Sequence, residues 1–224
     1  MINLPDFRKA FEYENNSYLS CDNTRFSKFL SHYELFKMTR DLPGAIIECG
    51  VFKAASSVRF AGFRDLYGNS FSNKIIGFDV FEEFPETSFK EEIKFREHFI
   101  NEAGSSSISM EQLQEVLKEK GIEKNIELVK GDITKTVPEY VKNNPQIKIS
   151  LLNLDTDIYE PAVTALEYFY PRIVIGGILI LDDYGTFPGE TKAVDDYFKG
   201  ENIEIKKFPF AMTPSYIIKK EEMH

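Results

Sequence analysis

Carboxylates follow five short apolar segments of this chain, and their placement suggests that they meet at one site. They are Glu48, Asp79, Asp132, Asp155 and the adjacent pair Asp182 and Asp183. If the apolar segments are parallel strands, their carboxyl ends share one edge of a sheet, which is where such sheets bind ligands. A single aspartate there is more typical of a turn or a helix cap. Six anions on one edge would repel one another, so they indicate a bound cation or a ligand with hydroxyl and ammonium donors.

Asp155 and the pair Asp182–Asp183 are the candidate metal ligands. They follow two apolar segments that are expected to be neighbouring or nearly neighbouring strands. Three carboxylates with room for water suit Mg²⁺ or another hard divalent cation better than zinc, which prefers histidine and cysteine. The alternative for Asp182, Asp183, Tyr184 and Gly185 is a solvated turn.

The segments that must position these residues alternate between strand and helix patterns. Strands are expected at 45–49, 74–79, 126–130, 149–154 and 173–181, with two closing strands at 203–208 and 216–219. Helices are expected at 23–39, 54–67, 136–143, 161–169 and 190–198, with Pro138 in a first turn, where its missing N–H is harmless. Because the apolar runs are continuous, they predict an α/β fold, a doubly wound, mostly parallel sheet with helices on both faces.

The length of 224 residues suits a single α/β domain over 1–224. Residues 1–22 are expected to form an N-terminal arm or lid, and 82–121 a helical insertion. Residues 1–22 and 81–108 are rich in aromatic residues, which either close over a ligand or a neighbouring subunit or complete the core: Phe11, Tyr13, Tyr18, Phe81, Phe84, Phe89 and Phe95.

Composition excludes several classes of protein. The formal net charge of −9 argues against nucleic acid or an anionic membrane surface as the main partner. Two cysteines, Cys21 and Cys49, are too few for a disulfide framework or a zinc cluster. The run 173–181 is too short to cross a bilayer, and the N-terminal residues have no secretion signal pattern, so the expected location is the cytoplasm. The number of subunits is left open, and a homo-oligomer is compatible with the sequence.

The turn after the first strand bears on the cofactor. It has one glycine, Gly50, where a dinucleotide fingerprint needs three, so a nicotinamide cofactor is disfavoured. An acidic residue ending the second strand, Asp79, is placed to accept hydrogen bonds from ribose hydroxyls. This chemistry predicts S-adenosylmethionine (SAM), with Asp132 near the adenine amine. The expected cofactor site comprises Glu48, Gly50, Val51, Ser56, Ser57, Asp79, Asp132, Ile133 and Asp155.

Five blocks of the chain resemble the macrocin O-methyltransferase family: Ile47–Ala54, Gly77–Phe81, Lys130–Ile133, Leu154–Glu160 and Gly176 through Tyr184. The resemblance covers roughly residues 25–200. It implies the Rossmann-like class I methyltransferase fold, with a seven-stranded sheet whose last strand is antiparallel. It also implies a SAM-dependent, Mg²⁺-dependent O-methyltransferase (EC 2.1.1.-) that acts on a hydroxyl of a sugar or glycoside. Asp155, Asp182 and Asp183 match the family's metal ligands. The arm and the insertion fall mostly outside the resemblance, so it does not identify the acceptor.

Two carboxylates are candidates to accept the proton of the acceptor hydroxyl, Asp155 and Asp157, and Asp155 is preferred. His32 is expected to have a structural role. A first alternative is a metal-dependent glycosyltransferase, because Asp155-Thr156-Asp157 forms a D-x-D pattern. A second is a non-catalytic SAM-binding protein, which would need no metal carboxylates.

Overall fold

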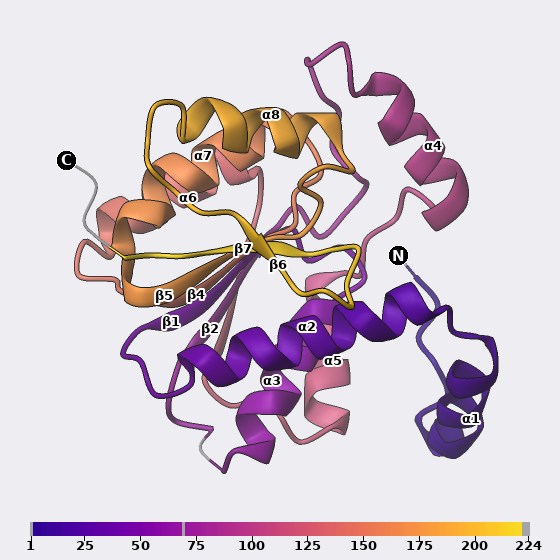
Figure 1. The fold of residues 1–224 in the computed structure, drawn as a ribbon. Helices are drawn as coiled ribbons and strands as arrows, with labels where there is room; N and C mark the ends of the chain where they lie inside the picture. Colours follow the sequence, from indigo (N-terminus) through magenta and orange to yellow (C-terminus); the bar gives the residue numbers. More distant parts are fainter. Residues whose placement is uncertain (1, 69, 221–224) are drawn as a thin grey trace.

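A seven-stranded sheet lies at the centre of the computed structural model, which describes residues 2–68 and 70–220 (Figure 1). The strand order is β3-β2-β1-β4-β5-β7-β6. The strands are β1 (Ala45–Cys49), β2 (Ile75–Asp79), β3 (Ile126–Lys130), β4 (Ile149–Leu154), β5 (Ile173–Leu181), β6 (Lys206–Lys207) and β7 (Ser215–Ile218). Strands β1 to β5 pair in parallel, whereas β7 is antiparallel to β5 and β6. The predicted fold class, including its antiparallel last strand, is confirmed.

Helices cover both faces of the sheet, as the continuous apolar strands predicted (Figure 1). One face carries α2 (Asn23–Thr39), α3 (Ala55–Leu66) and α5 (Met110–Glu119), and the other carries α6 (Ile133–Asn143), α7 (Tyr159–Phe169) and α8 (Pro188–Tyr197). A short 3-10 helix, η2 (Tyr170–Arg172), leads into β5. Each face has its own buried apolar cluster, so the sheet is buried on both sides. No helix in the described part of the chain is both long and apolar enough to cross a membrane.

Two elements differ from their predicted bounds by more than two residues at one end. Helix α6 begins at Ile133 because the Asp132 carboxylate caps it, accepting a hydrogen bond of 2.9 Å from the Thr134 amide. Pro138 therefore lies inside the helix and not in its first turn, which corrects the prediction. The first closing strand, expected at 203–208, is reduced to the two residues of β6.

The N-terminal arm is helical, which its sequence pattern did not predict. It consists of the 3-10 helix η1 (Phe7–Lys9) and helix α1 (Ala10–Ser20), and neither has a buried residue. Figure 1 shows α1 projecting away from the sheet. Phe11 and Tyr18 are exposed on it, so their role as a lid stays a prediction.

The insertion contains two helices, as expected. Helix α4 (Ile93–Ala103) has no buried residue and lies at the periphery (Figure 1). Helix α5 starts with a capping box at Ser109 and buries Leu113 and Leu117 in the core. Of the aromatic residues here, Phe81 and Phe84 are buried, whereas Phe95 is half exposed. The insertion thus contributes to the core through one helix and leaves the other free to border a site.

Candidate functional site

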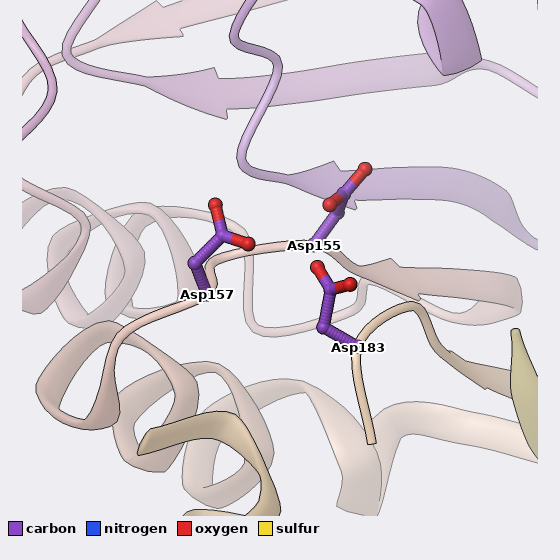
Figure 2. Close-up of side chains that lie close together, drawn as sticks. All are labelled: Asp155, Asp157 and Asp183. Carbon is purple, nitrogen blue, oxygen red and sulfur yellow. The ribbon is translucent and has the colours of Figure 1, made fainter. Parts of the chain in front are cut away.

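Three carboxylates converge at the carboxyl ends of β4 and β5. Asp155, Asp157 and Asp183 each offer an oxygen, and these oxygens lie within 4.8 Å of one another (Figure 2). Asp155 directly follows β4, and Asp157 is two residues further along the same loop. Asp183 belongs to the turn after β5, which pairs with β4 in parallel. The topology therefore brings together residues that are far apart in the chain, as the sequence analysis expected for Asp155 and Asp183.

Asp182, the third predicted metal ligand, has other partners. It is fully buried and forms an ion pair with Lys28 of α2. The His32 Nε2 atom lies 3.5 Å from its Oδ1 atom, and the imidazole stacks on Phe60 at 5.1 Å, so His32 is the structural residue that was predicted. Burial raises the pKa of Asp182, but Lys28 and His32 outweigh burial and hold it below its ordinary value.

The electrostatics of the cluster favour a bound cation. Burial raises the pKa of Asp155 well above its ordinary value, and the Asp182 charge adds to the effect. Burial likewise raises the pKa of Asp157 and of Asp183, with repulsion from a neighbouring aspartate as the next cause in each case. Lys28 offsets only part of this repulsion. Closely spaced carboxylate oxygens are the ligands that Mg²⁺ and similar ions prefer, so the donor set fits such an ion.

A cavity of about 630 Å³ opens along the carboxyl ends of β1 to β4. Five residues of the predicted cofactor site line it: Gly50, Asp79, Asp132, Ile133 and Asp155. It lies where the strand order reverses between β1 and β4, the position at which doubly wound sheets bind ligands.

Asp79 both lines this cavity and holds two loops together. Its Oδ2 atom accepts hydrogen bonds from the amides of Val51 (2.7 Å) and Phe52 (3.1 Å). Its Oδ1 atom accepts one of 2.6 Å from the Phe81 amide. A carboxylate oxygen has further lone-pair directions, so these bonds leave capacity for ribose hydroxyls.

The remaining residues of the predicted cofactor site do not line the first cavity. Glu48 and Ser57 are buried and hydrogen-bonded to each other, and the Asn153 side-chain amide donates to Glu48 at 3.2 Å. Burial raises the pKa of Glu48 to about 7. Val51 and Ser56 line a second cavity. Glu48 therefore links β1 to α3 and to β4.

The second cavity has a volume of about 570 Å³ and shares its wall with the first. Phe52, Asp155 and Asp157 line both cavities, and Asp183 lines the second. The acidic cluster thus stands between two spaces, each large enough for a small molecule.

Two residues of this wall have unusual backbone conformations. Phe52 and Asp157 have φ angles of 47° and 60°, in the left-handed region that non-glycine residues rarely adopt. Gly50 has a φ of 91°, and a Cβ atom on it would lie 1.8 Å from the Asp155 carbonyl oxygen. The close approach of β1 to β4 therefore requires glycine at this position.

Comparison with known proteins identifies the family. The macrocin-O-methyltransferase (TylF) family matches residues 21–210. The chain belongs to this family. A relative from Streptomyces olivaceus, named 8-demethyl-8-(2,3-dimethoxy-alpha-L-rhamnosyl)-tetracenomycin-C 4'-O-methyltransferase, is 28% identical over 158 residues, which are 70% of this chain and 58% of the relative. A relative from Micromonospora griseorubida, named mycinamicin III 3''-O-methyltransferase, is 25% identical over 70% of this chain and 61% of its own length.

The fold comparison agrees with the family. The crystal structure of CalS11, a calicheamicin methyltransferase, superposes with a TM-score of 0.75 and 26% identity, over 92% of this chain and 84% of that chain. The chain spans about three-fifths of the length of the curated relatives that it matches. The sequence resemblance to macrocin O-methyltransferases is thus confirmed.

Two groups of residues at the site were not predicted from the sequence: Lys28, and Glu160 with its partners Thr87 and Ser88. Lys28 lies one helical turn before His32, so both project from the buried side of α2, and this spacing was a usable signal. Glu160 binds the insertion loop, accepting from the Ser88 amide at 3.0 Å and facing the Thr87 hydroxyl at 3.3 Å. Glu160, Thr87 and Ser88 line the first cavity. The sequence around 87–88 has no periodicity from which this position could be predicted.

Proposed function

We propose that this protein is a SAM-dependent O-methyltransferase that acts on a hydroxyl of a sugar or glycoside and uses Mg²⁺ or another hard divalent cation. The main support is the position of the acidic cluster in the wall between two cavities. A methyl donor in one cavity and an acceptor in the other would meet there, and such proximity provides a large part of the rate enhancement in bimolecular transfers. The names of the relatives support the sugar as the acceptor class.

In this proposal the first cavity holds SAM. Asp79 would accept the ribose hydroxyls, and Asp132 would lie near the adenine amine. Gly50 lets the turn after β1 approach Asp155 closely, so the methionine end can reach the shared wall. Glu160 fixes the insertion loop that closes one side of the cavity.

Asp155, Asp157 and Asp183 would hold the metal ion. Asp182 stays a candidate ligand, because its charge acts on the neighbouring Asp155. A metal ion there would take the place that the Lys28 ammonium now has beside Asp182. A bound divalent ion would lower the pKa of a coordinated hydroxyl and fix its position. Asp155 or Asp157 would accept the hydroxyl proton, since both line the wall that the two cavities share.

Paramagnetic Mn²⁺ titration can test the metal site separately from the cofactor site. Asp155→Asn and Asp183→Asn should each weaken Mn²⁺ binding at least about ten-fold, because each removes a charged ligand. Affinity for S-adenosylhomocysteine should change only a few fold in Asp183→Asn, because Asp183 does not line the first cavity. Asp41→Asn, at an exposed aspartate paired with Arg40, is the matched control and should change neither. Unchanged Mn²⁺ affinity in both site variants would remove the metal from the proposal.

The alternatives predict different products. A glycosyltransferase would use Asp155-Thr156-Asp157 to hold a nucleotide-sugar and would transfer a sugar without SAM. A non-catalytic SAM-binding protein would bind S-adenosylhomocysteine without needing Mn²⁺ or transferring a methyl group. Incubation with methyl-labelled SAM and a panel of sugars and glycosides, with and without Mg²⁺, separates the three. A cytoplasmic location, homo-oligomerisation and the absence of nucleic-acid partners stay predictions.

A further inference from the structure

Four cationic side chains line the second cavity of an otherwise acidic protein. They are Arg25 and Lys28 from α2, Lys53 from the turn after β1, and Arg59 from α3. The acidic cluster Asp155, Asp157 and Asp183 lines the same cavity, so cationic and anionic side chains both border it. A cationic side chain here calls for an explanation in terms of the ligand only where no protein group is paired with it.

Two of the four cations already have partners in the structure. Lys28 is paired with Asp182, and the Lys53 ammonium donates to the Ala103 carbonyl oxygen at the end of α4. Both therefore have structural roles that do not depend on a ligand.

Arg25 and Arg59 form no salt bridge with any residue that the structure describes. Arg59 is partly buried, with its guanidinium 5.8 Å from the centre of the Phe29 ring. Burial lowers its pKa, buried carboxylates counteract this, and the nearby Arg25 charge lowers it further. Two guanidinium groups that repel each other beside a cavity are stabilised when an anion lies between them.

The other lining residues offer apolar faces and acidic groups to a ligand in this cavity. Phe52, Phe99 and Phe187 provide apolar faces, of the kind on which sugar rings pack. The acidic cluster lies on one side, where an acceptor hydroxyl would be held. We propose that the acceptor is a sugar that carries a phosphate, which Arg25 and Arg59 bind while the hydroxyl faces the acidic cluster. This inference rests on the proposed function and specifies its substrate class.

Guanidinium groups suit this role because their fork of N–H donors matches phosphate oxygens in two-point hydrogen bonds. A sugar 1-phosphate and a nucleoside diphosphate-sugar share the phosphate and differ in the nucleoside. A neutral glycoside has no group for either arginine. The three classes can therefore be compared directly as ligands.

Calorimetric titration of the full chain, saturated with S-adenosylhomocysteine and Mg²⁺, tests the proposal with UDP-glucose, glucose 1-phosphate and methyl glucoside. Both phosphate ligands should bind more tightly than methyl glucoside, and added salt should weaken them. Arg59→Gln should weaken phosphate binding at least about ten-fold and Arg25→Gln several-fold, since each removes a charge-assisted contact. Tighter binding of UDP-glucose than of glucose 1-phosphate would identify the nucleoside-linked form.

The matched control is Lys142→Gln on α6, which removes the same charge from an exposed position that lines neither cavity. It should leave all three titrations unchanged. Arg59→Lys keeps the positive charge without the two-point guanidinium donors and should give intermediate phosphate affinity. Binding of S-adenosylhomocysteine by each variant verifies its fold. Phosphate binding that depends on Mg²⁺ but not on Arg25 or Arg59, or equal binding of methyl glucoside, overturns the inference. Failure of the wild type to bind S-adenosylhomocysteine would instead overturn the proposed function.

Discussion

Replacing Lys28 by methionine should destabilise the metal-free protein and strengthen its binding of a divalent cation. The Lys28 ammonium is paired with Asp182, which is fully buried and interacts with Asp155. Methionine keeps most of the apolar stem and removes the charge. The buried Asp182 carboxylate would then lose its ion pair and keep His32 beside it. A bound cation would supply the missing charge, so the defect should depend on the metal.

The magnitude follows from the burial of the pair. Removing one partner of a buried ion pair costs about 3–5 kcal/mol. The Lys28 side chain keeps 20% of its exposure, so water reaches the pair and the lower end, about 3 kcal/mol, applies. For a chain of this size, each kcal/mol lowers the melting temperature by about 2–4 °C, which predicts a decrease of about 6–12 °C without metal. Saturating Mg²⁺ should restore most of it.

Thermal melts of the wild type and variant with chelator and with saturating Mg²⁺ measure this effect. Lys37→Met is the matched control, because Lys37 lies on the same helix in an exposed pair with Glu34 and should contribute less than about 1 kcal/mol. Mn²⁺ titration should show tighter binding by Lys28→Met than by the wild type. An equal decrease in melting temperature with and without Mg²⁺, or no decrease at all, would refute the reasoning.

Three further predictions follow from the site. Gly50→Ala should destabilise the protein by about 3 kcal/mol or more in denaturant titrations, because its Cβ would overlap the Asp155 carbonyl, whereas Gly62→Ala has free space in a helix and should be neutral or stabilising. Asp79→Asn should weaken S-adenosylhomocysteine binding by about 2–3 kcal/mol in calorimetry, and an unchanged isotherm would place the ribose elsewhere. If residues 1–22 form a lid, their proteolytic cleavage should slow when S-adenosylhomocysteine and Mg²⁺ are added, and equal rates would contradict this.

The sheet could be predicted from the sequence because each parallel strand is a continuous apolar run with a polar end. The predicted bounds of β1, β3, β4 and β5 agree with the structure, and the alternation with helices determines the order of layers. The helix in the N-terminal arm could not be predicted, for the opposite reason. Helix α1 buries no residue, so no apolar periodicity marks it.

The same contrast applies to the site. Carboxylates at strand ends are found from the sequence because parallel strands bring their carboxyl ends to one edge, which is how Asp155 and Asp183 were placed together. The position of Asp157 depends on a left-handed backbone conformation, and that of Asp182 on a lysine from a distant helix. Neither the backbone conformation at Asp157 nor the packing of α2 against the strand ends follows from residue spacing. The sequence therefore could not show that Asp157 joins the cluster while Asp182 pairs with Lys28.

The shared wall has a consequence for how variants should behave. Phe52, Asp155 and Asp157 line both cavities, whereas Asp132 lines only the first and Arg59 only the second. If the two cavities hold the cofactor and the acceptor, as we propose, a change in the wall should affect the binding of both. Changes at Asp132 and Arg59 lie away from this wall, so each should affect one ligand, and their free-energy effects should add. Phe52 and Asp157 of this wall have left-handed backbone conformations, and Gly50 lets the turn after β1 approach Asp155. If the wall holds a methyl donor and an acceptor in fixed alignment, as we propose, these conformations would fix the side chains that lie between the two ligands.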